Sequence, residues 1–317
     1  MSDCICFATL AAAGSSGAVI PPGTPAVVID QFDDSSDVSA AVYIPYLGTG
    51  APPGHELSFE NDGNWWVIHP DYLTLEAAGA PSAGGNCAPA MCRVLAYLAF
   101  VTRATLKLGT RDYILSYAAT LTQTDPENDP VLYFSVAGQG PRVSRLLIPF
   151  VTDPIKPLGA FAITFSNNLS GFEAREFSVI ATGATTAGRG CGTAILANFP
   201  GLLGGGLGED PSPGHHRGAL VSHVEIGNDD NQIGGVAYSY FVTGLDLTGA
   251  GNLLVSDVAI TGPNGPDALT TNMCLQVQGE CSDESPAYLP ACHLRIDDCY
   301  GPTLIALRLA SAQTGIS

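Results

Sequence analysis

The chain has 317 residues, 46% of them hydrophobic, which is enough for one large domain or two ordinary ones. Its 30 acidic and 12 basic residues give a formal charge of −18, which disfavours nucleic acid and anionic membrane surfaces as partners. With 37 glycines, 23 prolines and abundant branched and aromatic residues, the composition indicates turn-rich β structure rather than disorder. The apolar runs fall well short of the roughly 18 residues of a membrane span.

Residues 1–30 are rich in Ala, Gly, Ser and Pro and show little periodic pattern. Their apolar stretch follows Asp3 and lacks a preceding Lys or Arg, so we expect a cytosolic start without a signal peptide. The nine cysteines are odd in number and scattered, which favours buried reduced thiols over disulfides or metal ligands. We therefore expect no metal and no cofactor.

The stretch NCAPAMCRVLAYLAFVTR (86–103) predicts the one convincing helix of the chain. Pro89 suits its first turn, and Met91, Leu95 and Leu98 contribute to a broad apolar face. A face this apolar indicates packing against a core.

Short alternating strands recur from residue 105 onward, and the repeat decides the expected fold. The intervals between successive anchors are 26, 31, 32, 50, 30 and 30 residues, for the anchors Leu106, Leu132, Ile163, Ile195, Leu245, Leu275 and Ile305. The long interval contains the Gly- and Pro-rich stretch 199–217, which is typical of a loop inserted into a repeating scaffold.

A second strand is expected in each repeat, marked by an apolar pair at i and i+2. The pairs are Phe177/Val179, Val224/Ile226, Val258/Ile260 and Leu294/Ile296, and five positions before each lies Phe172, Ala219, Leu253 or Leu289. Two or three short strands per repeat, without crossover helices, predict an all-β fold: a right-handed parallel β-helix of about seven rungs. A β-sandwich, the rival fold, rarely shows so regular a repeat.

The expected organisation has three parts. Residues 1–30 form an N-terminal segment, residues 31–103 hold the leading strands and the helix that caps the β-helix, and residues 104–317 form the β-helix with the inserted loop 199–217. The cap is expected because an open first rung is an exposed sheet edge.

Three motifs in order carry a resemblance to a known family. They are ENDGNWWVIHPDYLTLEAAGA (60–80), ATLKLGTRDYILS (104–116) after the helix, and VLYFSVAGQGPRVSRLLIP (131–149), the last with Gly138, Gly140, Ser144 and Leu146 in a G-x-G-x-x-x-S-x-L pattern. Over roughly residues 60–317 the chain resembles the pectate-lyase-like right-handed β-helix spikes of phages. Its segment 81–91 lacks the acids common there, and the calcium-binding carboxylates of pectate lyases find no match, so no catalytic residue is carried over.

This resemblance implies a head or tail spike of a phage or a phage-like particle, such as a gene transfer agent. It further implies a homotrimer on the particle surface, attached to other particle proteins through residues 1–30. Cytoplasmic assembly fits the reduced cysteines and the missing signal peptide.

Acidic residues at outward positions of the expected strands, and one just after a strand, are the candidates for catalysis. A pair of carboxylates at suitable spacing hydrolyses glycosidic bonds, and the candidates are Glu225, Asp230, Asp246 and Asp257. The alternative is an ordinary solvated acidic face, which a chain of charge −18 has in plenty.

The candidates for carbohydrate binding are Tyr238, Tyr240 and Asp229. The two tyrosines share one face of the extended segment 234–244, where aromatic rings stack on sugars. Subunit packing is the alternative for this face.

Three functions remain open on these grounds. The leading hypothesis is a non-enzymatic spike that binds a host-surface polysaccharide. The second is a depolymerase, a hydrolase or lyase on the same scaffold, and the third is a purely structural component of the particle. Neither nucleic acid nor membrane is an expected partner.

Overall fold

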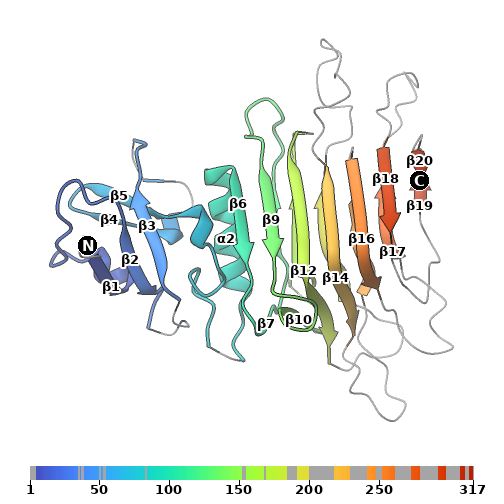
Figure 1. Ribbon diagram of the computed structural model, residues 1–317, viewed down its shortest axis with the longest axis horizontal. Coiled ribbons are helices and arrows are strands. Elements are labelled where there is room, and N and C mark those ends of the chain that lie inside the picture. Colours follow the sequence, from blue (N-terminus) through green and yellow to red (C-terminus); the bar gives the residue numbers. More distant parts are fainter. Residues whose placement is uncertain are drawn as a thin grey trace.

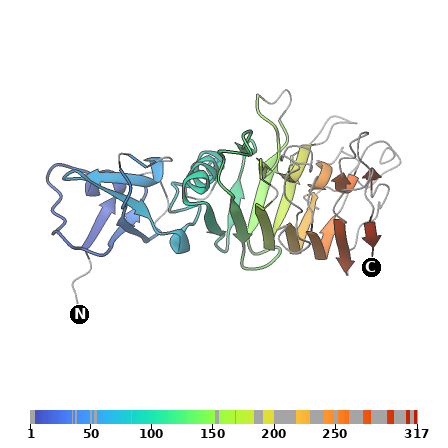
Figure 2. The ribbon, with the colours of Figure 1, turned by 90° about the horizontal axis from the view of Figure 1, so that it is seen from above.

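The computed structural model describes most of the chain from residue 5 to residue 316. The described residues are 5–34, 36, 39–49, 51–52, 55–82, 84–151, 155–167, 169–183, 191–199, 218–228, 241–247, 252–260, 273–278, 292–297, 308–310 and 314–316. A small N-terminal sheet, a helix and a long stack of strands follow one another along the long axis (Figures 1 and 2).

The N-terminal sheet, called the head below, has five strands in the order β1-β2-β3-β5-β4. Strands β1 and β2 are parallel, and the remaining pairs are antiparallel. The strands are β1 (Ile5–Thr9), β2 (Val27–Gln31), β3 (Ala41–Pro45), β4 (Ser58–Asn61) and β5 (Asn64–Ile68), with the short helices α1 (Leu10–Ala13), η1 (His55–Leu57) and η2 (Pro70–Tyr72). The expected division after residue 30 therefore falls inside β2, and residues 5–31 share a sheet with residues 41–68.

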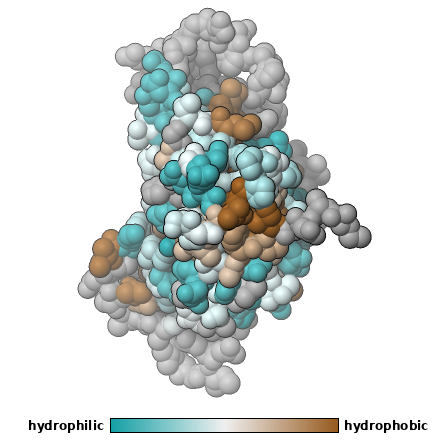
Figure 3. Space-filling view, turned by 90° about the vertical axis from the view of Figure 1, so that its left-hand side faces the viewer, coloured by the Kyte–Doolittle hydropathy of each residue, from teal (hydrophilic) through white to brown (hydrophobic). Residues whose placement is uncertain are grey.

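The head has a packed interior and a mixed surface. Its inward side chains include Val27, Ile29, Tyr43 and Trp66, each at most 5% exposed. Seen from the N-terminal end, apolar patches are separated by hydrophilic residues (Figure 3).

Beyond the head, every strand pair of the described residues is parallel, as a β-helix requires. A nine-stranded sheet contains β6 (Arg103–Lys107), β7 (Asp112–Ile114), β9 (Tyr133–Ala137), β10 (Arg145–Pro149), β12 (Gly171–Thr182), β14 (Ala219–Asn228), β16 (Asn252–Ile260), β18 (Cys292–Asp297) and β20 (Thr314–Ile316). A six-stranded sheet contains β8 (Ala119–Thr122), β11 (Phe161–Thr164), β13 (Cys191–Asn198), β15 (Phe241–Asp246), β17 (Met273–Gln278) and β19 (Arg308–Ala310). The chain alternates between the two sheets, so each turn of the β-helix contributes strands to both.

The expected register holds in the middle of the stack and slips at both ends. Phe177 pairs with Val224 and Val224 with Val258, as the repeat predicts. Leu294, however, pairs with Leu253, so the pair Leu294/Ile296 continues the first half of β16 rather than the second.

The anchor residues at the start of the predicted repeat lie in two different sheets. Leu106 lies in the nine-stranded sheet opposite Val136, whereas Ile163 lies in the six-stranded sheet opposite Leu121 and Ala197. Alternation alone does not distinguish the two sheets, because both bury every second residue.

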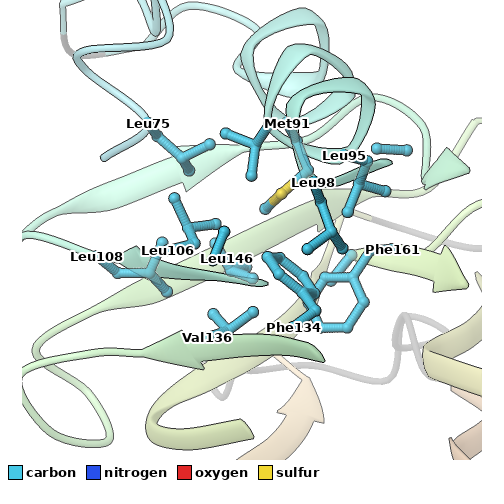
Figure 4. Close-up of a cluster of buried hydrophobic side chains, with 14 of the residues drawn as sticks. Leu75, Met91, Leu95, Leu98, Leu106, Leu108, Phe134, Val136, Leu146 and Phe161 are labelled. Carbon is cyan, nitrogen blue, oxygen red and sulfur yellow. The ribbon is translucent and has the colours of Figure 1, made fainter. Parts of the chain in front are cut away.

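Helix α2 (Ala88–Val101) lies where the head meets the first strands of the stack (Figure 1). Its side chains Met91, Leu95 and Leu98 are at most 1% exposed and point toward Leu106 and Phe134 of the stack (Figure 4). Pro89 occupies the first turn, and Thr102, with φ 62°, ends the helix in the left-handed conformation. The helix is 14 residues long, and the described part of the chain contains no helix of the length and apolarity that a membrane crossing requires.

The opposite face of α2 contacts the head. Arg93 donates from Nε to Glu56 Oε2 at 2.7 Å, donates to the Ala78 carbonyl at 3.0 Å and lies 4.5 Å from the Phe32 ring centre. The Tyr97 hydroxyl donates to the Ile68 carbonyl. One helix therefore contributes to both cores.

A buried polar group joins the segment before α2 to the first turn of the stack. The Tyr113 hydroxyl donates to Glu76 Oε1 at 2.6 Å, and Arg111 lies 3.4 Å from the same oxygen. Burial, followed by the neighbouring Glu76 carboxylate, raises the pKa of Tyr113. The phenol consequently stays a hydrogen-bond donor at neutral pH.

Candidate functional site

Three ionisable side chains lie one above another at a corner of the stack. Glu176 in β12, His223 in β14 and Asp257 in β16 have φ values of 60°, 51° and 50°. The residues on either side of each are paired, Arg175 with Ser222 and Phe177 with Val224, so these positions stack from turn to turn. We call Glu176, His223 and Asp257 the corner column.

The corner residue explains how one long strand covers two faces. In β12 the inward residues are Phe172 and Ala174 before the corner, and Phe177 and Val179 after it. The residue in the left-handed conformation inserts one extra position, which bends the strand and resets the alternation, as a β-bulge does.

The side chains of the corner column contact one another. His223 Nε2 lies 3.0 Å from Asp257 Oδ2, and His223 Nδ1 lies 3.6 Å from Glu176 Oε1. The three side chains are 43% to 53% exposed. The column thus places an imidazole between two carboxylates, with all three open to solvent.

The left-handed conformation is unusual for residues other than Gly and costs most for Glu176. An ordinary side chain loses about 1–2 kcal/mol there, whereas Asp and His, like Asn, adopt this conformation several-fold more often. Backbone positions of this kind are retained mainly where the side chain has a role. Three successive turns carry Glu, His and Asp there, which favours a functional role for the column.

An ion pair borders the column on the second half of β14. Arg142 Nε lies 3.1 Å from Glu225 Oε2, and its terminal nitrogen lies 3.3 Å from Oε1, so the guanidinium holds the carboxylate with two bonds. The Arg142 amide donates to Ser178 Oγ at 2.9 Å, which fixes the loop that carries it.

A glycine brings that loop against the column. A Cβ added to Gly138 would stand 2.0 Å from the carbonyl oxygen of Glu176, so only glycine fits there. The Gly140 amide donates to the same carbonyl at 2.8 Å. The loop and the first residue of the column are therefore held together.

A polar strip lies on the outer face of the first half of β12 and its neighbour β9. The Tyr133 hydroxyl donates to Glu173 Oε2 at 2.8 Å, and Arg175 lies 3.4 Å from Glu173 Oε1. The Arg103 guanidinium lies over the Tyr133 ring at 5.2 Å. The strip adds an aromatic ring and hydrogen-bonding groups beside the column.

The structure places two of the predicted catalytic residues on neighbouring strands of the nine-stranded sheet and a third in the six-stranded sheet. Asp257 belongs to the corner column, and Glu225 lies two residues after His223 on β14. Asp246 lies in the six-stranded sheet, where it pairs with Leu196 and Gln276, so it belongs to another face. The predicted residues Asp229, Asp230, Tyr238 and Tyr240 lie outside the described residues.

Sequence reasoning missed Glu176 and His223. The signal was present, because each stands immediately before the apolar pair of its repeat, as Asp257 does. Aligning the repeats on Phe177, Val224 and Val258 places the three in one column.

The column has the elements of acid–base chemistry. Its two carboxylates stand two strand spacings apart, about 9.5 Å between equivalent backbone positions. Paired carboxyl groups act as acid and base in glycosidases, and histidine is a common general acid or base in enzymes. Among the described residues, no three His, Cys, Asp or Glu side chains gather in a way that could hold a metal ion.

Comparisons with known proteins address the fold. No family model matches the chain, and no curated protein matches it. Among solved structures, full-length tailspike protein 2 from Escherichia coli O157:H7 bacteriophage CAB120 aligns with 95% of the chain at 14% identity and a TM-score of 0.51. The chain spans only about a third (35%) of the length of that tailspike.

Two further structures align less closely. The enzymatically active domain of Bacteriophage CBA120 tailspike protein 2 aligns with 88% of the chain and 44% of its own length, at 12% identity and a TM-score of 0.44. Pantoea stewartii WceF, a glycan biofilm modifying enzyme with a tailspike-like parallel β-helix fold, aligns with the whole chain and 52% of its own length, at 10% identity and a TM-score of 0.31. The parallel pairing and the alignment with the full-length tailspike together show that this chain has the parallel β-helix fold of the phage tailspikes.

Proposed function

We propose that the chain is part of a spike of a phage or phage-like particle and binds a host-surface polysaccharide. The observation that carries this proposal is the corner column, in which Glu176, His223 and Asp257 repeat at one position of successive turns. Repeated, half-exposed polar groups along an axis suit a repeating polymer, because each turn offers the same kind of contact to the next unit of the chain.

The polar strip supports the same role. Sugar rings are bound by an aromatic face together with hydrogen bonds to their hydroxyl groups. Tyr133, Glu173 and Arg175 supply a ring, a carboxylate acceptor and a guanidinium donor within one stretch of outer surface. The strip adjoins the column directly, since Arg175 precedes Glu176.

Attachment and assembly are part of the proposal. Residues 1–30 would bind other particle proteins, and the spike would be a homotrimer at the particle surface. The described part of residues 1–30 contributes β1 and most of β2 to the head, so the attachment surface would be a folded sheet rather than a loose arm.

A depolymerase is the second candidate, and one observation favours it. Glu176 and Asp257 flank His223 on a surface open to solvent. A glycosidic bond placed at His223 would have a carboxylate on either side, as hydrolysis by an acid and a base requires.

The test uses the purified chain and capsular polysaccharides and lipopolysaccharides from a panel of candidate host cells. Co-sedimentation measures binding, and size-exclusion chromatography of the polymer measures chain length. Binding without shortening establishes the binder, and binding with shortening establishes the depolymerase. Failure to bind across the panel would contradict both and leave a purely structural role.

Matched variants connect the result to the column. The double substitution Glu176→Gln and Asp257→Asn should weaken binding about thirtyfold, since each change replaces a hydrogen bond to a charged group, about 1.5–3 kcal/mol, by one to a neutral group, about 0.5–1.5 kcal/mol. Asp246→Asn removes an acid from the six-stranded sheet and should leave binding unchanged. Equal effects of the two changes would argue against the column as the site.

A further inference from the structure

The charged groups of the described surface are arranged in an unequal way. Every lysine and arginine whose side chain the structure describes is engaged by a neighbouring group, whereas acids such as Glu60, Asp62 and Glu127 are exposed to solvent. Five arginines pair with carboxylates: Arg93 with Glu56, Arg111 with Glu76, Arg142 with Glu225, Arg145 with Asp112 and Arg175 with Glu173.

The three remaining cations whose side chains the structure describes are also engaged. Arg103 lies over the Tyr133 ring, and Lys156 lies 4.2 Å from the centre of the Tyr117 ring. Lys107 Nζ donates to the Asp71 carbonyl at 2.7 Å. Among the described side chains, therefore, each positive charge already has a partner within the chain.

The proposed site itself is acidic. The column and its borders hold four carboxylates, on Glu173, Glu176, Glu225 and Asp257, against the two guanidinium groups of Arg142 and Arg175 and the single imidazole of His223. Each guanidinium group is paired with one of those carboxylates, Arg142 with Glu225 and Arg175 with Glu173. The whole chain adds a formal charge of −18.

We infer that the polysaccharide bound by the column is uncharged, and that acidic polymers are excluded. This inference rests on the proposed function. A polymer bearing carboxylates or phosphates needs cationic partners to replace its hydration, and here it would meet carboxylates instead. The hydroxyl and N-acetyl groups of uncharged sugars can use the same carboxylates as hydrogen-bond acceptors.

Carboxyl reduction provides the experiment, because it replaces each carboxylate of the polymer by a neutral hydroxymethyl group and leaves the glycosidic linkages unchanged. Hyaluronan, alginate and each acidic capsular polysaccharide of the panel would be compared with their carboxyl-reduced forms and with uncharged O-polysaccharides, by co-sedimentation at 20 and 150 mM salt. Binding confined to uncharged or reduced polymers supports the inference. Binding of an acidic form that disappears on reduction overturns it but leaves the proposed function standing. If neither form of any polymer binds, the proposed function fails and the inference falls with it.

Charge variants test the cause of the exclusion. Glu173→Gln with Glu176→Gln removes two negative charges from the site, and acidic polymers should then bind about fourfold better at low salt, by a Coulomb estimate in water at about 10 Å. Glu60→Gln with Glu127→Gln removes two charges elsewhere and is the matched control. If both variants gained the same affinity for acidic polymers, the carboxylates of the site would not be the cause of the exclusion.

Discussion

At the scale of single residues, the chemistry of the corner column and its backbone conformation favour different side chains. Asn or Gly would adopt the left-handed conformation of residues 176, 223 and 257 more readily than the residues present. The contacts of His223 with Asp257 and Glu176 are half-exposed, and even a fully charged pair at such a site contributes at most about 1 kcal/mol. The column is therefore expected to matter more for binding than for stability.

His223→Asn tests this expectation. The free energy of unfolding should change by less than about 1 kcal/mol, because the easier backbone conformation offsets the lost contacts. Polysaccharide binding should fall about tenfold, since one hydrogen bond to the polymer, about 0.5–1.5 kcal/mol, is lost. Urea unfolding and co-sedimentation measure the two effects.

Thr102→Asn is the matched control. Thr102 also has a positive φ, 62°, but lies at the end of α2. It should leave binding unchanged and leave the protein as stable or more stable. A large loss of stability in His223→Asn, with binding intact, would show that the column serves the fold instead.

At the scale of elements, the sequence predicts where the strands lie far better than it predicts which strands pair with one another. The alternation at Phe177/Val179 and Val224/Ile226 reports burial directly, and the structure pairs these residues as expected. The alternation at Leu294/Ile296 is equally clear but belongs to the other half of the strand. A one-residue corner resets the alternation, and nothing in the apolar pattern shows on which side of the corner a pair lies.

The head was harder to foresee for another reason. Strand β1 (ICFAT) pairs with β2 (VVIDQ) across an intervening 17 residues that include α1, and each strand has only five residues. Short strands without a repeat offer few positions from which to judge periodicity. The catalytic candidates were hard to group for a related reason. The sequence shows that an acidic residue points outward, but it does not show which of the two sheets carries that residue.

Gly138→Ala tests how the loop before β10 positions the column. The new Cβ would stand 2.0 Å from the Glu176 carbonyl and 2.9 Å from Phe177 Cβ, so the loop must shift. Stability should fall by about 1–3 kcal/mol, as for other overpacked sites, and binding should weaken with it.

A second glycine controls for the general effect of replacing glycine. A Cβ at Gly17 meets no atom within 4 Å, so Gly17→Ala should be neutral or stabilising by up to about 1 kcal/mol. Thermal unfolding of the two variants in parallel decides between them. A neutral Gly138→Ala would refute the close approach of the loop to Glu176.

At the scale of the whole molecule, α2 makes the head and the stack one folding unit. Its apolar face enters the core of the stack, and its other face holds the head through Arg93 and Tyr97. Calorimetry should therefore show a single unfolding transition for both parts.

Arg93→Ala tests the connection. It removes the contacts with Glu56, the Ala78 carbonyl and the Phe32 ring, and should lower stability by about 2–4 kcal/mol or separate the head transition from that of the stack. Arg145→Ala breaks the ion pair with Asp112, within the nine-stranded sheet, and should change stability by at most about 1 kcal/mol. Two transitions in the unaltered protein would contradict a single unit.

The stacking of the corner column also sets a measure of length. Strands in a sheet are about 4.8 Å apart, so successive residues of the column are separated by about that distance along the axis of the β-helix. Each turn contributes a single exposed residue to the column, whereas the spacing of these residues is set by the buried core beneath them. If the column binds a polysaccharide as proposed, substitutions at single corner residues would change the bound polymer one turn at a time while the scaffold stays the same.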